Sequence, residues 1–450
     1  MKKILSVACA LMVAASLFGA AKKSGKVTIN LYAFTNEVPG MVEKYVNAKY
    51  KDVVDLKVNI TATTNGEYQP VLDAAMANGM VDMFAAESAF VQKYTKGSAS
   101  DNSAEYKKDL GIKVDKLIKD AGIAEYTIDI GKNQKGQIVG LGYQATGGAF
   151  IYNRTVAKTV FGSDDPKAVS AAIGGGSQSW TKFWDAAKKC ADKGVAIVSG
   201  DGDVWHAIEN SSAKGWINED DELYIDPARE AFFDVSKNLW DNGWSNKTQD
   251  WTDAWYADMA ELGEKPVLGF FGPAWLINYV MAGNAKDTYG DWAVTDSPVG
   301  FFWGGTWVLA TKKAAANKEK KAIIADIIQW ITLDSSNDGL LYSWANGTYC
   351  YTYNKGADPT VNTKDAVSSA TVMAKSNGKL DFLGGQDMFD YFVPAGKYAS
   401  GKNLTEFDET INSYYRDQVR AYAAGQKSKA DAIKDFKKKV LDELEIESAN

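Results

Sequence analysis

Tryptophan is concentrated in the middle of the chain, and several tryptophans stand beside glycine. All 14 tryptophans lie between Trp180 and Trp344, and the runs FFGPAW (270–275) and FFWGGTW (301–307) interrupt aromatic side chains with glycine or proline. A flat ring packs against the apolar face of a pyranose, so this arrangement is typical of a sugar-binding cleft. Burial in the core is the alternative for any tryptophan, since this side chain buries a large area wherever it lies.

The segment SGDGDVWH (199–206) is the best candidate cluster of polar side chains in the chain. Asp201, Asp203 and Trp205 follow a predicted strand at the point where a helix should begin. An ionised carboxylate accepts charge-assisted hydrogen bonds from sugar hydroxyls, and Trp205 supplies a ring for stacking. The alternative for Asp203 is a helix cap that accepts backbone N–H bonds. A calcium loop is excluded, because Trp205 stands where an oxygen ligand is required.

Polar side chains also follow the first and third predicted strands. Asn36 and Glu37 come after VTINLYAF (27–34), and Glu87 comes after VDMFAA (81–86). Ligands bind at the carboxyl ends of parallel strands, so we expect these three side chains at a binding cleft. Glu37 has an alternative role, because a carboxylate stabilises the N-terminus of a helix. No helix cap is needed at Glu87.

Two tryptophans at glycine-containing turns are expected to stack on a ligand. Trp275 follows a Gly-Pro pair at a strand-to-helix turn. Trp303 and Gly305 share one side of an extended strand, because side chains alternate along a strand. We therefore expect Trp303 in the cleft and Trp307 in the core. Trp205 completes this set of predicted stacking surfaces.

Two further pairs are interpreted from their position. Gln144 and Thr146 lie in the glycine-rich segment 139–154, which we interpret as a crossing between domains. Each side chain has two alternative hydrogen-bond partners, the ligand or the backbone. Trp251 and Trp255 stand four apart, which places them on one helix face, an arrangement more typical of packing than of binding. Trp255 is kept as a candidate.

The sequence argues against several enzyme classes. His206 is the only histidine, and Cys190 and Cys350 lie far apart, so a zinc site is not expected. No G-x-S-x-G nucleophile motif is present, and GLGYQATG (140–147) lacks the glycine spacing of a dinucleotide-binding loop. The formal net charge of −7 argues against nucleic acid and anionic membranes as partners. We expect no catalytic residue, no metal and no cofactor.

The first 21 residues have the three parts of an export signal. A short basic start precedes an apolar stretch over residues 4–18, and small residues follow it. The apolar stretch is too short for a stable membrane span, and no later segment is long enough. Too little apolar sequence precedes Cys9 for a lipoprotein signal, so we expect cleavage after Ala21. About 430 residues then remain, which is enough for two cores.

Strands and helices alternate from the start of the mature chain. Predicted strands 27–34, 55–62 and 81–86 are separated by helices that begin at Pro39 and span 69–78. This order predicts a parallel sheet with helices on both faces. The alternation begins again after the glycine-rich crossing. The second series comprises helices 181–193 and 227–241, strands 195–200 and 266–271, a core helix with isoleucines between 323 and 331, and C-terminal helices over 386–399, 404–424 and 427–443.

Four segments in this order resemble the extracellular solute-binding proteins of sugar-importing ABC transporters, of the family 1 type. They are FTNEVPGM (34–41), GYQATGGAFIYNR (142–154), FFGPAW (270–275) and FFWGGTW (301–307). The resemblance covers essentially the whole mature chain. It implies an α/β, two-lobed, periplasmic-binding-protein-like fold of class II. Each lobe would be a mainly parallel sheet flanked by helices, with the ligand cleft between the lobes.

The resemblance also implies lobes that are discontinuous in sequence. Gly304 and Gly305 match the position at which members of this family bring backbone close to the ligand, and the C-terminal helices would belong mainly to the second lobe. The chain would cross between lobes near 142–147, 298–305 and 350–360. The implied lobes are 22–141 plus about 305–352 and 142–304 plus about 353–450.

The function implied by the resemblance is non-catalytic capture. The protein would be a monomer exported to the periplasm or to the outer face of the cytoplasmic membrane. It would bind a sugar or short oligosaccharide and deliver it to the membrane permease of an ABC importer. A secreted glycoside hydrolase is the alternative, because it too needs aromatic side chains and paired carboxylates. A surface adhesin is a third interpretation, and it predicts no ligand-induced closure.

Overall fold

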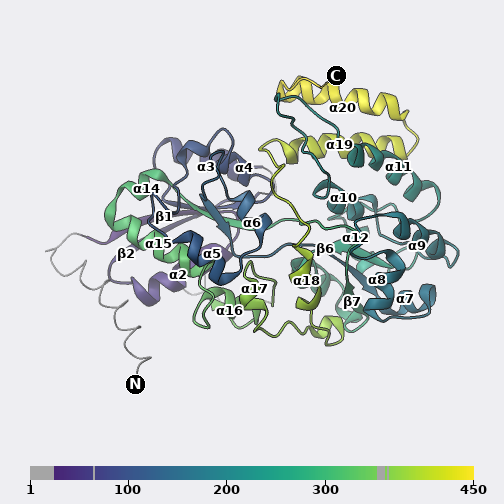
Figure 1. Ribbon diagram of the computed structural model, residues 1–450, viewed down its shortest axis with the longest axis horizontal. Helices are drawn as coiled ribbons and strands as arrows, with labels where there is room; N and C mark the ends of the chain where they lie inside the picture. The colour runs from purple at the N-terminus through teal and green to yellow at the C-terminus, as the bar shows by residue number, and fades with distance from the viewer. Residues whose placement is uncertain (1–24, 64–65, 352–359, 362–363, 450) are drawn as a thin grey trace.

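The computed structural model describes residues 25–63, 66–351, 360–361 and 364–449. Their elements are grouped around two main β-sheets that form two lobes, at the left and the right of Figure 1. The predicted export signal and its cysteine lie outside the described residues. Within the described part of the chain, no helix combines the length and the apolar character that a membrane span requires.

The first lobe contains a five-stranded sheet in the order β2-β1-β3-β8-β4. β1 is parallel to β2 and to β3, as predicted, while β8 lies antiparallel between β3 and β4. β8 runs in the opposite direction because it brings the chain back from the second lobe. The strands are β1 (Val27–Ala33), β2 (Val54–Ile60), β3 (Met83–Glu87), β4 (Gly140–Gly142) and β8 (Thr306–Ala310).

Apolar faces of helices form the core of this lobe. α15 (Lys318–Thr332) packs against β1 and β8, and its isoleucines at 323, 324, 327, 328 and 331 are at most 1% exposed, as their spacing predicts. α2 (Glu37–Lys49) packs against β1 and β2. It begins two residues before Pro39, the predicted start, so the carboxylate of Glu37 lies in its first turn.

The second lobe contains a three-stranded sheet in the order β6-β5-β7. Both neighbours of β5 (Ala149–Asn153) are antiparallel to it, namely β6 (Gly269–Gly272) and β7 (Trp292–Thr295). The expectation of a mainly parallel sheet is wrong for this lobe. β5 carries the chain out of the first lobe, whereas β6 and β7 run back toward it, so the central strand must oppose both neighbours.

The predicted strand 195–200 is also wrong. These residues form only two isolated parallel bridges, Ala196 with Val267 and Val198 with Ser245. Their apolar side chains are nevertheless buried, with Ile197 and Val198 at 0% exposure. The apolar run therefore indicates burial and not strand pairing. Periodicity alone does not distinguish a buried strand from another buried segment.

Helices surround both sheets. α11 spans the predicted residues 227–241, with Asp226 accepting the N–H of Ala228 as its cap and Pro227 at its first position. α19 (Asp408–Ala423) packs on α11 and on α20 (Lys429–Leu444). Besides α2 and α15, the helices on the side of the five-stranded sheet are α3 (Tyr68–Ala77), α4 (Val91–Thr95), η1 (Ser100–Asn102), α5 (Val114–Ala121), α6 (Glu125–Ile130), α14 (Lys312–Ala316), α16 (Leu340–Ala345) and α17 (Ala370–Met373). The remaining elements are α7 (Arg154–Phe161), α8 (Pro166–Ile173), α9 (Thr181–Ala191), α10 (Asp201–Glu209), α11 (Pro227–Asp241), α12 (Asp253–Met259), η2 (Leu276–Met281), α13 (Ala282–Asn284), η3 (Lys286–Thr288), β9 (Cys350–Tyr351), β10 (Thr360–Val361), η4 (Asp381–Leu383), α18 (Phe389–Ala395), α19 (Asp408–Ala423) and α20 (Lys429–Leu444).

Connecting segments lie side by side between the two sheets. The segment from β4 to β5 pairs with the segment from β7 to β8 through an antiparallel bridge between Gly147 and Phe302. Thr146 ties the same two segments together, because its Oγ1 donates to the carbonyl of Gly304 at 2.9 Å. A third segment joins them through the bridge between Gln144 and Val367.

Candidate ligand-binding site

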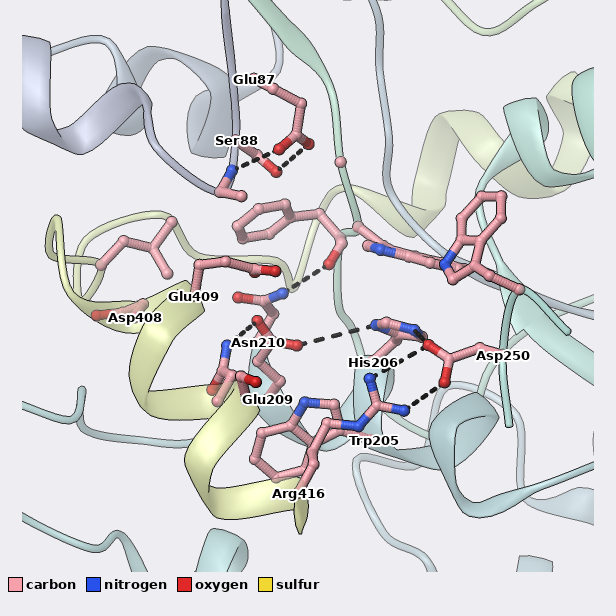
Figure 2. Close-up of a pocket in the computed structure, with 18 of the residues that line it drawn as sticks. Glu87, Ser88, Trp205, His206, Glu209, Asn210, Asp250, Asp408, Glu409 and Arg416 are labelled. Carbon is pink, nitrogen blue, oxygen red and sulfur yellow. Dashed lines mark hydrogen bonds and ion pairs between the residues drawn. The ribbon is translucent and has the colours of Figure 1, made fainter. Parts of the chain in front are cut away.

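A cavity of about 320 Å³ opens between the two lobes (Figure 2). Its wall combines residues from the end of β3, from the connecting segment before β8, and from α10 and α19. This volume lies within the range of small-molecule sites, which begins at about 300 Å³. The ligand of such a cavity contacts both lobes at once.

Three tryptophans form an aromatic cluster, of which Trp251 and Trp303 line this cavity and Trp275 packs against Trp303 outside the lining. The ring of Trp303 stacks on His206, with centroids 3.6 Å apart and planes at 13°. Trp275 meets Trp303 edge to face at 4.7 Å, and its Nε1 donates to the Trp303 carbonyl at 3.0 Å. Trp251 lies parallel to Trp275, with centroids 6.1 Å apart and planes at 9°. We call Trp251, Trp275 and Trp303 the aromatic cluster.

Trp251 is exposed and strained. Its side chain is 51% exposed, and its backbone has a φ of 66°, the left-handed region that favours glycine. α12 begins only at Asp253, so Trp251 and Trp255 do not share a helix face and that expectation is wrong. A large apolar side chain held exposed on a strained backbone is typical of a functional position. Trp255 is 1% exposed and contributes to the core.

The segment 199–206 divides between the cavity and the interior. Trp205 lines the cavity but is 1% exposed, packed among Trp216 and other core aromatics. The carboxylate of Asp203 accepts the N–H of Gly200 and the Nε1–H of Trp255, both at 2.9 Å, and burial raises the pKa of Asp203 to about 7. These bonds match the helix-cap alternative. Asp203 does not line the cavity.

Asp201 also points away from the cavity. Its Oδ2 accepts a hydrogen bond from Ser236 at 2.6 Å, and its Oδ1 lies 4.0 Å from the Arg420 guanidinium. Gly202 next to it allows a close approach, since a Cβ here would lie 2.7 Å from atoms of Arg416 and Asp250. Gly202 therefore lets the start of α10 approach Arg416 and Asp250 closely.

Glu87 lines the cavity from the first lobe. Its two carboxylate oxygens accept from Ser88 Oγ and from the N–H of Ala89, each at 2.8 Å. Burial raises the pKa of Glu87 to about 7, and the charge of Glu409 adds to the effect of burial. Gly304 lies beside it, with a φ of 73° that suits glycine, and a Cβ there would lie 3.6 Å from Glu87 Oε1.

The remaining first-lobe candidates lie outside this cavity. Glu37 accepts from the Tyr143 hydroxyl at 2.6 Å, and burial raises its pKa. Gln144 donates to the buried Asp365 at 3.2 Å. Asn36 is exposed and makes no side-chain cap to α2. Thr146 and Gly305 belong to the connecting segments, and the φ of 115° at Gly305 requires glycine.

An ion pair that the sequence analysis missed forms the second-lobe wall. Arg416 donates from both terminal nitrogens to Asp250, with Nη1 at 3.2 Å from Oδ2. His206 Nε2 lies 3.3 Å from the same Oδ2. Burial opposes ionisation of Asp250, but the hydrogen bond from His206 and the charge of Arg416 outweigh it and hold the Asp250 pKa well below its usual range. Burial lowers the pKa of His206, which is therefore neutral at pH 7.

Two further carboxylates reach the cavity from α10 and α19. Glu209 accepts from Asn412 at 2.7 Å through Oε1, and burial together with the charge of Glu409 raises its pKa to about 8. Glu409 is exposed, and among the described residues it has no hydrogen bond or ion pair. In Figure 2 its carboxylate lies between Glu87 and Glu209. Three carboxylates from both lobes thus face one space.

The spacing of charged residues on α19 was the one feature of the sequence that indicated any of the cavity residues missing from the prediction. Glu409, Arg416 and Arg420 belong to a predicted amphipathic helix, where charged side chains ordinarily face solvent. Arg416 and Arg420 are four residues apart and share a face. Glu209 and Asp250 had no such signal, because their partners come from elements distant in the sequence.

Comparisons with known proteins identify the fold. The sequence matches no protein-family model and no curated protein. An extracellular solute-binding protein of family 1 is similar in structure, with a TM-score of 0.72 and 19% identity over 91% of this chain and 98% of that chain. The galacto-N-biose/lacto-N-biose I-binding protein of a Bifidobacterium longum ABC transporter, in complex with lacto-N-biose, has a TM-score of 0.65 and 16% identity over 95% and 100%. An ABC substrate-binding protein from Listeria monocytogenes, in complex with cycloalternan, has a TM-score of 0.63 and 14% identity over 94% and 100%.

The chain has the two-lobed fold of the extracellular solute-binding proteins. The expected α/β fold class is confirmed, with the correction of strand direction in the second sheet. In this solute-binding fold the cavity of Figure 2 occupies the cleft between the lobes.

Proposed function

We propose that the protein binds a sugar or short oligosaccharide outside the cytoplasm and delivers it to the permease of an ABC importer. The observation that carries this proposal is the aromatic cluster beside carboxylates in a cavity between two lobes. Aromatic rings accept the apolar face of a sugar, and carboxylates accept its hydroxyls. The sugar complexes of two proteins with the same fold support the same ligand class.

The cleft residues have separate roles in this proposal. The exposed ring of Trp251 stacks on the ligand, and the rings of Trp275 and Trp303 hold the Trp251 ring in place. Glu87, in the first lobe, accepts hydrogen bonds from the hydroxyls of the sugar. Glu209 does the same in the second lobe. Trp205 supports the floor of the cavity from the core side. Ligand contacts with both lobes favour the closed form, which the permease would recognise.

We further propose where the chain crosses between the lobes. The segments at 142–147 and 298–305 connect the two main sheets and serve as hinge strands. α17 packs on α5 and α16, and Ser369 bridges to Ile123, so we place residues up to α17 in the first lobe. The last crossing then falls between α17 and α18, beyond the 350–360 expected from the sequence.

The proposal includes absence of catalysis, export by the leader, and a monomeric state. Tryptophan fluorescence during titration with a panel of mono- and oligosaccharides tests it, together with chromatographic analysis of the sugar after long incubation. A saturable fluorescence change with intact sugar supports capture. Released product would establish the glycoside hydrolase instead, and silence toward the whole panel would reject a sugar ligand.

A further inference from the structure

The charges that line the cavity do not balance. Six carboxylates line it, but only two guanidinium groups do, and His206 is neutral at pH 7. Both guanidinium groups are already occupied. Arg416 is paired with Asp250, and Arg420 lies within 4.0 Å of Asp250, Asp201 and Asp417. The buried Arg229, outside the lining, favours the ionised forms of Glu209 and Asp408, whereas Glu87 and Glu409 make no ion pair with a cationic side chain in the described part of the chain.

The surplus carboxylates belong to opposite lobes. Glu87 ends β3 of the first lobe, whereas Glu209 and Glu409 lie on α10 and α19 of the second. Glu409 is near enough to both to raise their pKa values through its charge. In the empty cleft Glu87 and Glu209 are partly protonated at pH 7, because burial and the charge of Glu409 oppose their ionisation. A cation between them would favour their ionisation instead.

Two acceptors on the wall lack a donor. His206 is 7% exposed and lines the cavity, and its Nδ1 has no hydrogen-bond partner among the described residues. Because Nε2 faces the ionised Asp250, Nε2 carries the proton and Nδ1 is an acceptor. Glu209 Oε2 lies 3.9 Å from Nδ1. A group with several N–H donors satisfies both atoms, whereas one hydroxyl donates a single hydrogen bond.

A metal ion does not fit this arrangement. Within the described ranges, no three His, Cys, Asp or Glu side chains are close enough together to hold a metal ion. The carboxylates instead border a cavity wide enough for an organic group, with the ring of Trp303 stacked on His206 at its wall. An aromatic face attracts an organic cation through the negative potential of the ring.

We propose that the natural ligand is a cationic sugar, an amino sugar or oligosaccharide whose ammonium group lies among Glu87, Glu209 and Glu409 while a ring stacks on Trp251. This inference rests on the proposed sugar-binding function. It assigns Glu409 as a residue that determines specificity, because its side chain lines the cavity and makes no hydrogen bond or ion pair among the described residues. The ammonium bridges the lobes and favours closure.

Matched ligands test the inference by titration calorimetry at pH 7. The chitosan disaccharide, which carries free amines, is compared with cellobiose and with N,N′-diacetylchitobiose, and glucosamine and galactosamine are compared with glucose and galactose. The amine-bearing member of a pair is expected to bind at least about tenfold more tightly. Glu409→Gln should remove most of that preference and leave the neutral sugar's affinity within about twofold.

Glu443→Gln is the matched control, because it removes the same charge from α20, where Glu443 pairs with Lys439 outside the cavity. It should keep the full preference. Equal or tighter binding of the neutral sugars, or a preference that survives Glu409→Gln, overturns the cationic ligand and leaves sugar capture standing. Binding of spermidine with no binding of any sugar overturns sugar capture and the cationic sugar with it.

Discussion

Trp251 separates binding from stability at the level of a single residue. Its left-handed backbone costs free energy in the folded state, and its ring is half exposed at the cleft. Trp251→Gly relieves this backbone but loses the ring's contacts with Trp255, Trp275 and Trp303, so the two effects on the free energy of unfolding oppose each other and should leave it within about 1 kcal/mol of the wild type. Sugar binding should weaken at least about tenfold. Urea denaturation measures the free energy of unfolding, and calorimetric titration measures the affinity.

Trp255 gives the contrasting control, since it is buried and donates to Asp203. Trp255→Ala should lower the free energy of unfolding by about 3–5 kcal/mol. An unchanged sugar affinity in Trp251→Gly would remove Trp251 from the ligand site.

Glu209 makes stability depend on pH. Its pKa is about 8 in the folded protein and ordinarily 4.5, so the folded state holds the proton more tightly between these values. The stability that this group contributes is complete below pH 4.5 and is lost as the pH rises through 8. Thermal melts of the unliganded protein across pH 5–8 should show a decline that is shallower in Glu209→Gln. The charged or titratable groups near Glu209 are His206, Arg229, Asp408, Glu409 and Arg416. A slope identical to that of the wild type would contradict the raised pKa.

At the scale of elements, α19 joins the core to the cleft through its two faces. Ile411, Tyr415 and Val419 are buried against α11 and α20, while Glu409 and Arg416 face the cavity. The ion pair between Arg416 and Asp250 ties this helix to the segment before α12. The position of the cavity carboxylates therefore depends on the packing of α19.

Breaking that ion pair should be costly. Arg416→Leu leaves Asp250 charged and buried, so we expect the free energy of unfolding to fall by about 3–5 kcal/mol. The double variant Arg416→Leu with Asp250→Asn removes both charges and should recover most of that loss. Urea denaturation of wild type, both single variants and the double variant gives the coupling energy. Strictly additive losses would show that the pair is not coupled.

Elements that bury an apolar face were predictable from the sequence, and sites assembled from several elements were predictable only in part. α11 and α15 follow from their caps and their spacing, because those signals are local. Glu87, Trp275 and Trp303 were found because they stand at strand ends or turns. Glu209 and Glu409 were not, since a charged side chain on a helix surface looks the same whether it faces solvent or a second lobe.

At the scale of the whole molecule, the placement of the cavity predicts closure. Its wall comes from both lobes, and in the proposed hinge the connecting segments pair through isolated bridges and the hydrogen bond from Thr146 to Gly304. A ligand that contacts both walls lowers the free energy of the closed form relative to the open form, and therefore shifts the population toward the closed form. The charge of Glu409 opposes ionisation of Glu87 across the empty cleft, and this repulsion favours the open form.

The sugar that binds most tightly in the titrations should therefore both make the molecule more compact and raise its free energy of unfolding. Small-angle X-ray scattering should show a smaller radius of gyration in saturating sugar than in its absence. At a free sugar concentration of 100 times Kd, the free energy of unfolding should rise by about 2.7 kcal/mol, because the sugar binds only the folded state. Trp251→Gly at the same sugar concentration should show a rise of only about 1.4 kcal/mol if its Kd is tenfold higher. Saturable binding with an unchanged radius of gyration would contradict closure and favour a rigid adhesin.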